Sequence, residues 1–151
     1  MSYKIIAINK KAYRDYEIIR TWEAGIVLKG SEVKSIKNNK ISLQEGWIDV
    51  VDNQTWLKNV NIAHYTEANI FNHDTKADRK LLLHKKEIIK LHEGIQEKGY
   101  TAIPLKVYLK NNLIKLEIAL TKGRKTYDKR EYEKKRQAQI DIHRELKNNK
   151  K

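Results

Sequence analysis

The chain has 151 residues, and its 32 Lys and Arg against 19 Asp and Glu give a formal net charge of +13. It has no cysteine, which excludes disulfides, thiolate metal sites and a cysteine nucleophile. Because no apolar run approaches the roughly 18 residues of a membrane span and the N-terminus lacks the pattern of a signal peptide, we expect a cytoplasmic protein without a membrane partner.

The N-terminal region carries the first basic cluster. It consists of Asn9, Lys10, Lys11 and Arg14, interleaved with Tyr13 and Tyr16. Cations neutralise phosphates and flat rings stack on bases, so this mixture suits a nucleic-acid surface. A single cluster of this kind is just as typical of solvated charge beside aromatic core residues.

The next segment, Asp15–Leu28, is rich in β-branched and aromatic residues and predicts a strand with a bulge or bend at Gly25. Ser31–Asn39 predicts a short helix with Ser31 as its N-cap. In it, Glu32-Val33-Lys34 forms the E-x-K pattern of some metal-dependent nucleases, with Asp15 as a third ligand. Such a short pattern is common by chance, and these sites occupy strands rather than helices.

Two further strands, Trp47–Val51 and Thr55–Ile62, flank the turn-forming residues 52–54. The polar stretch Thr66–Lys80 then predicts a long loop, and loops of that length are usually functional or mobile. His73-Asp74 within it could bind a metal, but no second ligand stands at helical spacing. A hydrogen-bonded loop is therefore the better interpretation.

The segment His84–Gly99 predicts a helix that ends at Gly99 and that Gly94 could split. A second basic cluster, Arg79-Lys80 and Lys85-Lys86, flanks the apolar run Leu81-Leu82-Leu83 just before it. We find no Gly-rich phosphate loop and no nucleophile elbow in the chain, so we expect no cofactor, no metal and no enzymatic activity.

The clearest element is a hairpin over Leu105–Leu120, because Asn111-Asn112 can adopt the positive φ angles of a two-residue turn. The turn pairs Leu109 with Ile114, Val107 with Leu116 and Leu105 with Ile118 on one face, and Lys106 with Glu117 on the other. A third basic cluster is then expected on the solvent side, with Lys106, Tyr108, Lys110 and Lys115.

Many short strands interrupted by helices predict a mainly β fold. We expect a small closed or nearly closed, OB-like β-barrel with two or three inserted helices over residues 1–122, and a basic tail over residues 123–151. The last thirty residues hold twelve Lys and Arg against five Asp and Glu, with too few apolar residues for a core. Such a tail is expected to be disordered in solution and to form a helix on a polyanionic partner, with RNA as the first candidate.

Several short motifs together resemble the SsrA-binding protein (small protein B) family. They are Asn9-Lys10-Lys11-Ala12, Glu23-Ala24-Gly25-Ile26, Gly30-Ser31-Glu32-Val33-Lys34-Ser35, Phe71-Asn72-His73-Asp74, Arg79-Lys80-Leu81-Leu82-Leu83, Glu97-Lys98-Gly99 and Tyr127-Asp128-Lys129-Arg130. Two departures are modest: Arg124 stands where the family more often has Lys, and Thr75 stands where it usually has Pro.

The resemblance implies an RNA-binding adaptor of bacterial ribosome rescue. Family members bind the tRNA-like domain of transfer-messenger RNA (tmRNA, the SsrA RNA), with elongation factor Tu on the charged RNA, and deliver it to the A site of stalled ribosomes. Their tail enters the decoding centre and the empty mRNA channel, where it contacts rRNA.

By matching motif, the resemblance places Asn9, Glu23, Leu82 and Lys115 on the RNA face or where they shape it. Gly123, Arg124 and Lys125 match the junction, and Tyr127, Asp128, Lys129 and Arg130 match the element for the decoding centre. Together with the basic clusters, the predicted RNA-binding residues are Asn9, Lys10, Lys11, Arg14, Glu23, Arg79, Lys80, Leu82 and Lys115. The rivals are a metal nuclease using Glu32 and Lys34, and a general basic RNA chaperone.

Overall fold

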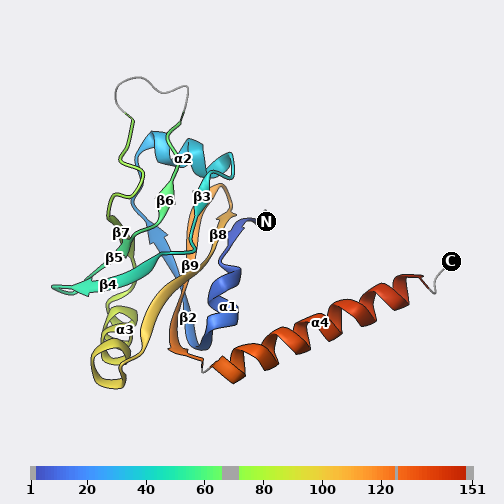
Figure 1. The fold of residues 1–151 in the computed structure, drawn as a ribbon. Helices are drawn as coiled ribbons and strands as arrows, with labels where there is room; N and C mark the ends of the chain where they lie inside the picture. The colour runs from blue at the N-terminus through green and yellow to red at the C-terminus, as the bar shows by residue number, and fades with distance from the viewer. Residues whose placement is uncertain (1–2, 66–71, 125, 149–151) are drawn as a thin grey trace.

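The computed structural model describes residues 3–65, 72–124 and 126–148. Seven of its strands form one sheet, in the order β1-β8-β9-β2-β7-β5-β4, and β3 and β6 form a separate pair (Figure 1). The elements in chain order are β1 (Tyr3–Ile8), α1 (Lys10–Asp15), β2 (Tyr16–Ile26), α2 (Gly30–Lys37), β3 (Ile41–Ser42), β4 (Trp47–Val51), β5 (Gln54–Lys58), β6 (Asn61–Ile62), β7 (Arg79–Leu82), α3 (Lys85–Lys98), β8 (Thr101–Lys110), β9 (Leu113–Gly123) and α4 (Thr126–Asn148).

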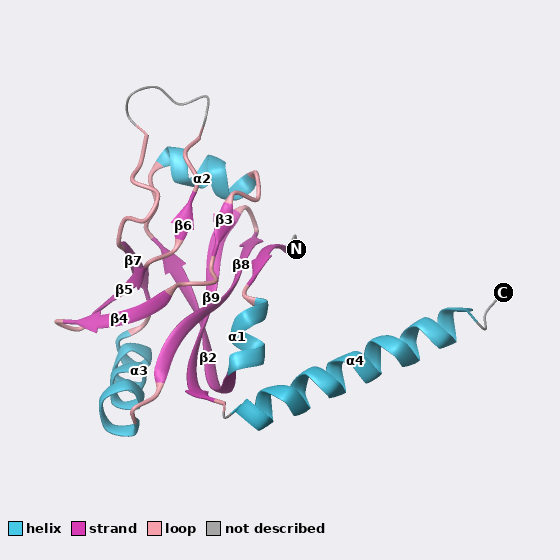
Figure 2. Ribbon diagram, viewed as in Figure 1, coloured by secondary structure: helices cyan, strands magenta, loops and turns pink. Residues whose placement is uncertain are grey.

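The predicted mainly β, OB-like fold is confirmed, but among the described residues the sheet does not close into a barrel. The sheet curls around a common interior, but its edge strands β1 and β4 are not paired with each other in the described part of the chain. Figure 2 shows α2 and α3 at opposite ends of the curled sheet, α1 beside it, and α4 projecting away from the body. The barrel is therefore incomplete, and both edges are open.

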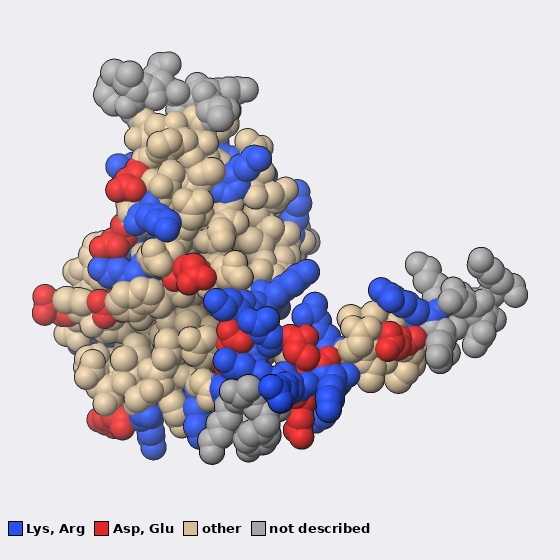
Figure 3. All heavy atoms as spheres, in the orientation of Figure 1, with Lys and Arg blue, Asp and Glu red and all other residues tan. Residues whose placement is uncertain are grey.

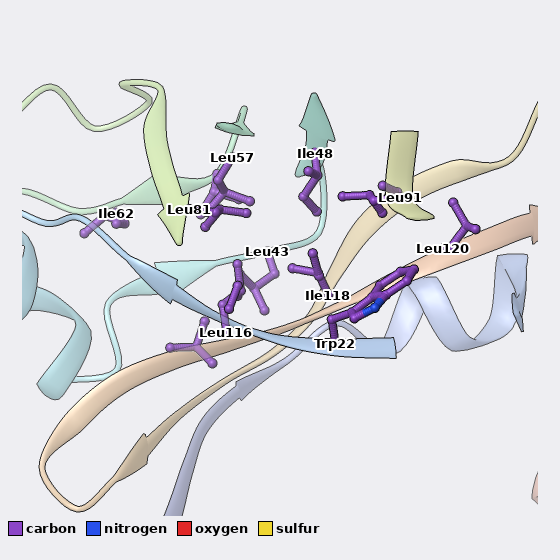
Figure 4. Packing of buried hydrophobic residues seen from close by; sticks show 14 of the residues in the cluster. Trp22, Leu43, Ile48, Leu57, Ile62, Leu81, Leu91, Leu116, Ile118 and Leu120 are labelled. Atoms are coloured by element: carbon purple, nitrogen blue, oxygen red, sulfur yellow. The ribbon is translucent and has the colours of Figure 1, made fainter. Parts of the chain in front are cut away.

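The core fills the space between two halves of the curled sheet. In Figure 4, side chains from β4, β5 and β7 face those from β2 and β9. Leu91 of α3 packs at the end of this cluster and is fully buried. Burying one such side chain contributes about 1.5–3 kcal/mol. The labelled core residues are Trp22, Leu43, Ile48, Leu57, Ile62, Leu81, Leu91, Leu116, Ile118 and Leu120.

Gly94 does not split the predicted helix. Helix α3 runs without a break over Lys85–Lys98 and ends at Gly99, whose φ of 67° is left-handed. A Cβ atom at Gly94 would lie 2.2 Å from Cδ2 of Leu120. Glycine therefore lets α3 approach β9 closely.

The β8–β9 hairpin confirms most of the predicted register. Asn111 and Asn112 have φ angles of 52° and 66°, and the pairs Leu109–Ile114, Val107–Leu116 and Lys106–Glu117 form as expected. The pair Leu105–Ile118 is wrong, because the register shifts between Pro104 and Lys106 and Ile118 pairs with Pro104. Leu105 occupies this bulge, and its carbonyl accepts a 2.7 Å hydrogen bond from the N–H of Asn9.

The β4–β5 hairpin turns at Asp52-Asn53, with φ angles of 51° and 61°, so Gln54 already belongs to β5. The predicted strand Thr55–Ile62 is in fact two strands. Asn59 has a φ of 58°, and the chain beyond it leaves the large sheet to pair with β3. The positive φ at Asn59 explains the break, because it bends the chain away from the extended path of β5.

Two other expectations differ in detail. The irregularity of β2 falls between Ile18 and Arg20 and not at Gly25. Helix α2 begins at Gly30 with Lys29 as the N-cap residue, and the N–H of Lys29 donates to Oε1 of Glu32 over 2.8 Å. Ser31 is the second residue of the helix and therefore not its cap, and its hydroxyl is hydrogen-bonded to His73.

In the tail, which the sequence predicts to be disordered in solution and helical on a partner, residues Thr126–Asn148 form helix α4. The sequence predicts this helix over Lys129–Lys147, with Asp128 as a candidate N-cap, and α4 begins three residues before Lys129. Its sequence contains no Gly or Pro, and Gln137 donates to Asp141 four residues on, over 2.9 Å. Such local pairs favour a helix, although each adds only about 0.2–0.5 kcal/mol. The strand before it, β9, extends to Gly123, one residue past the predicted domain boundary.

Candidate nucleic-acid interface

Three separate segments meet on the outer side of the sheet around Gly25. The register pairs Gly25 with Leu82 of β7 on one side and with Lys115 of β9 on the other. A hollow of about 590 Å³ lies beside Gly25, and Glu23, Lys80, Leu82 and Lys115 all line it. Leu82 is 54% exposed in it. The structure thus brings together four of the predicted RNA-binding residues.

Glu23 is the acidic group of this surface. Its Oε2 accepts a 2.5 Å hydrogen bond from the hydroxyl of Tyr108, and its Oε1 lies 3.5 Å from Nζ of Lys110. The Tyr108 hydrogen bond, followed by the charges of Lys110 and Lys115, lowers the pKa of Glu23 below its ordinary value. Glu23 is therefore a fixed carboxylate that can accept further hydrogen bonds.

The sequence predicts Tyr108 on the solvent side of the hairpin, but this prediction is wrong. Its ring is almost completely buried, and the ring of Tyr3 lies 5.0 Å away because β1 pairs with β8 on that side. Burial, and then its hydrogen bond to Glu23, raises the pKa of Tyr108. Tyr108 therefore orients Glu23 rather than stacking on a base.

Asn9 shapes the surface from inside. It is 5% exposed, and its Nδ2 donates to the carbonyls of Pro104 at 2.9 Å and Leu43 at 3.3 Å. Its Oδ1 accepts the N–H of Ala12, which caps helix α1. Asn9 therefore fixes α1 against β8 and holds the bulge at Leu105.

Helix α1 presents the predicted basic side chains at the surface. Lys10 and Arg14 are exposed, whereas Lys11 is half-buried with its Nζ 3.6 Å from Oε1 of Glu45. Arg14 donates to Asp15 over 2.9 Å. Tyr13 and Tyr16 pack against the small cluster around Ala12 and Leu105 instead of standing free.

Arg79 differs most from the sequence expectation of an RNA-binding side chain. It is 3% exposed, and its Nε lies 2.5 Å from Oε2 of Glu32. Its other nitrogens donate to the carbonyls of Val60, Asp74 and Thr75. Its Nε, Nη1 and Nη2 groups therefore all donate within the protein and are not available to phosphate. These bonds connect the loop before β7 to α2 and to the segment that follows β5.

The ion pair between Arg79 and Glu32 also occupies the glutamate of the E-x-K pattern. Both carboxylate oxygens of Glu32 are hydrogen-bonded, one to Arg79 and one to the N–H of Lys29. Lys34 lies over the ring of Tyr65, 5.3 Å from its centroid, and Asp15 belongs to a different contact on α1. The structure does not bring these three residues together as metal ligands. No group of three or more His, Asp or Glu side chains with metal-binding geometry occurs among the described residues.

His73 confirms the prediction of a hydrogen-bonded loop. Its Nε2 lies 2.9 Å from the carbonyl of Ile62, so this nitrogen is the donor and carries the proton. Its Nδ1 then accepts the hydroxyl of Ser31 over 2.8 Å. Part of the predicted loop, residues 66–71, lies outside the described residues.

The tail is attached to the body at α1. The N–H of Arg124 donates to the carbonyl of Asp15 over 2.9 Å, and its Nε donates to the carbonyl of Tyr16 over 3.1 Å. Its guanidinium lies 5.0 Å from the ring centroid of Tyr132 in α4. Nζ of Lys129 lies 3.8 Å from Oδ1 of Asp15. Arg124 is therefore held by the body, and Gly123 is part of β9.

Figure 3 shows basic side chains gathered where α4 leaves the body beside α1, with acidic ones among them. Arg130 is exposed in the first turns of α4. Lys125 and the side chains of Tyr127 and Asp128 lie outside the described residues. Asp128 falls at the third position of the helix, because α4 begins at Thr126, and so it does not occupy the predicted N-cap position.

Sequence reasoning missed Asp15 as the anchor of the tail. From the sequence, Asp15 is considered only as a third metal ligand. No local pattern in the sequence links its charge to Lys129, which lies more than a hundred residues later. Its pKa is lowered by the hydrogen bond from Arg14 and then by the charges of Arg14, Lys129 and Lys11. The surrounding excess of cations in α1 and the tail is the signal that could have identified it.

Comparisons of the sequence with a family model and with individual proteins indicate the same family. The family model described as SmpB protein matches residues 6–148. The SsrA-binding protein of Ligilactobacillus salivarius is 50% identical over 95% of this chain and 92% of its own length. That of Persephonella marina is 51% identical over 97% of this chain and 93% of its own length.

Among solved structures, a similar chain comes from the work described as "tmRNA-SmpB: a journey to the center of the bacterial ribosome". It has a TM-score of 0.68 and 38% sequence identity, and the match covers 82% of this chain and 86% of that one. Within the described residues, no helix has the length and apolar character needed to cross a membrane.

Proposed function

The chain belongs to the SmpB protein family, and from this membership we propose that it is the RNA-binding adaptor of bacterial ribosome rescue, or trans-translation. In this proposal it acts in the cytoplasm and binds the tRNA-like domain of tmRNA. It delivers that RNA, with elongation factor Tu on its charged end, to the A site of a stalled ribosome.

The observation that carries the proposal is the surface around Gly25. Lys80 and Lys115 supply positive charge for phosphate, and exposed Leu82 supplies an apolar contact for a base or ribose. Glu23 cannot bind phosphate, so it contributes a directional acceptor for base edges or 2′-hydroxyl groups. A surface that combines these three contacts can distinguish one folded RNA from another.

The tail has a separate role in the proposal. Helix α4 carries cations on most of its circumference and buries little apolar surface, so it is available to a polyanion. We assign its first turns, with Tyr127, Asp128, Lys129 and Arg130, to the decoding centre. The rest of α4 would lie along the empty mRNA channel with Lys and Arg facing rRNA.

The metal-nuclease alternative has little support, because Glu32 is buried and paired with Arg79. We therefore propose a non-enzymatic role. The chaperone alternative predicts similar affinity for any structured RNA, whereas the adaptor predicts a preference for tmRNA.

The deciding experiment is a competition for the protein between labelled tmRNA and unlabelled bulk tRNA at fixed, near-physiological salt. Salt must be fixed because phosphate contacts make all affinities salt-dependent. Displacement of tmRNA only by a large excess of tRNA supports the adaptor. Equal displacement by both RNAs contradicts it, and Mg²⁺-dependent cleavage that Glu32→Ala abolishes would establish the nuclease instead.

A further inference from the structure

A second groove lies next to the candidate RNA surface, between β5, β7 and the start of α2. We propose that this groove is a pocket for one unpaired nucleotide of the bound RNA, with the indole of Trp56 stacking on the base and Lys29 and Lys80 holding its phosphate. The inference rests on the proposed RNA-binding function, but it adds a site outside the surface around Gly25.

The groove has the size and lining of a nucleotide pocket. Its volume is about 390 Å³, within the range of small-ligand pockets. Trp56, Val27, Leu28 and Ala77 supply apolar lining, and the two lysines stand with them. Val27 is 52% exposed, so part of this apolar lining is open to solvent. An aromatic ring beside cations is the combination that single-stranded RNA requires.

Within the described part of the chain, the polar groups at its inner end are already hydrogen-bonded and so cannot select a base. The nearly buried residues Glu32, Arg79 and His73 line it, and the polar atoms of all three are hydrogen-bonded within the protein. Binding there would depend on stacking and charge, which tolerate any of the four bases.

The groove is continuous with the candidate RNA surface. Trp56 of β5 pairs directly with Lys80 of β7, and Lys80 lines both hollows. On the other side of Lys80, its carbonyl accepts the N–H of Val27 over 2.9 Å. Asp78 is the acidic residue at this groove outside the buried ion pair, and Lys58 neutralises it at 2.7 Å. An RNA strand on Leu82 and Lys80 would therefore reach Trp56 without crossing an uncompensated negative charge.

The occupant must be an unpaired nucleotide. A base inside a duplex offers no free face to an indole, because both faces are stacked on its neighbours. Lys29 and Lys80 stand in the groove, and its carboxylates, Glu32 and Asp78, are paired with Arg79 and Lys58. The remaining positive charge favours a polyanion over a peptide that is basic or has few acidic residues.

The test compares Trp56→Leu with wild type on two RNAs of equal length, the tRNA-like domain of tmRNA and a fully paired duplex. Trp47→Leu is the control, because Trp47 is 43% exposed, whereas Trp56 is half-buried, and because Trp47 lies on edge strand β4 and lines a different hollow. We expect Trp56→Leu to weaken binding of the tRNA-like domain about ten-fold, the usual effect of losing one stacked base, and to leave duplex binding unchanged. Trp56→Phe should retain most of the affinity.

A second measurement uses the wild-type protein, so it does not depend on the folding of a variant. RNA substituted with 4-thiouridine is irradiated in the complex, and the crosslinked peptide is identified by mass spectrometry. A crosslink to Trp56 or to residues 27–29, which line this groove and not the hollow around Gly25, supports the pocket.

Unchanged affinity of folded Trp56→Leu for the tRNA-like domain, or crosslinks confined to other segments, overturns the pocket. An equal loss on both RNAs also overturns it, because stacking on an unpaired base cannot explain weaker duplex binding. These results are independent of the competition with bulk tRNA, in which the wild-type protein alone decides the proposed function.

Discussion

Nζ of Lys129, in the first turns of the tail helix, lies 3.8 Å from Oδ1 of Asp15, the last residue of α1. This ion pair and the Arg124 hydrogen bonds connect α4 to the body. The two side chains are 39% and 16% exposed, so the pair contributes at most about 1 kcal/mol and is screened by salt. The tail is therefore held in place weakly, and a partner can reorient it at little cost.

Replacing Asp15 with Asn should broaden the range of tail positions. Because the chain has no cysteine, spin labels can be introduced at Gln44→Cys on the body and Ile142→Cys on α4 without other changes. The label-to-label distance distribution should widen in Asp15→Asn and in wild type at high salt. Glu45→Gln, which changes a carboxylate near α1 that contacts Lys11, is the control. Identical distributions would show that the ion pair does not hold the tail.

The same contact should respond to acid. The pKa of Asp15 is lowered in the folded protein, so its stabilising contribution is complete above its unfolded value of about 3.9. The contribution is lost as the pH falls through the lower, folded pKa. The wild-type label distances should therefore stay constant from pH 7 to about pH 5 and broaden at more acidic pH, whereas Asp15→Asn should show no such transition.

Glu23→Ala should weaken binding of tmRNA by about 1–3 kcal/mol and leave the thermal unfolding midpoint close to that of wild type. The reason is that the proposal gives Glu23 directional hydrogen bonds to RNA, although removing an acid from a basic surface adds net attraction for RNA. Tyr108→Phe should give a smaller effect in the same direction, since Tyr108 donates to Oε2 of Glu23. Tighter binding of Glu23→Ala at low salt would mean that only net charge matters here.

Arg79→Met should destabilise the fold by about 3–5 kcal/mol, because it leaves the carboxylate of Glu32 buried without its partner. Urea unfolding monitored by circular dichroism measures this loss. Lys80→Met, one residue along β7 and half-buried at the surface, is the matched control and should cost much less. If the two variants are equally stable, Arg79 does not hold the loop to α2.

The features that the sequence predicted correctly are local ones. The Asn111-Asn112 turn depends only on residues that tolerate positive φ, so the pairs nearest to it were predictable. The bulge at Leu105 was not, because it depends on Asn9, whose side chain bonds Pro104 from 95 positions away.

Long-range pairing also separates the functional candidates. Arg79 and Lys80 are adjacent in the sequence and have the same charge, but alternation along β7 turns one into the core and the other outward. Which of the two is buried depends on Glu32, 47 positions earlier in the chain. The sequence alone therefore proposed both cations of this strand for RNA binding and could not tell that one of them is buried.

The tail makes the sharpest functional prediction. Replacing Asp128, Lys129 and Arg130 together with Ala should abolish rescue of stalled ribosomes, because it removes the side chains assigned to the decoding centre. Binding of free tmRNA should be nearly unchanged, since the proposed RNA surface around Gly25 lies on the sheet and not on α4. Gln137→Pro should have the same pair of effects, because proline in a helix interior costs about 3 kcal/mol and would interrupt α4.

A matched control separates position from total charge in this experiment. Replacing Lys134, Lys135 and Arg136 with Ala removes three cations from the next turns of α4 but leaves the first turn intact. We expect it to weaken ribosome binding in a salt-dependent way and to retain partial rescue, because in the proposal these residues would contact phosphate without a fixed register. Normal rescue by the variant at residues 128–130, or equal loss in both variants, would show that the tail is a non-specific basic anchor.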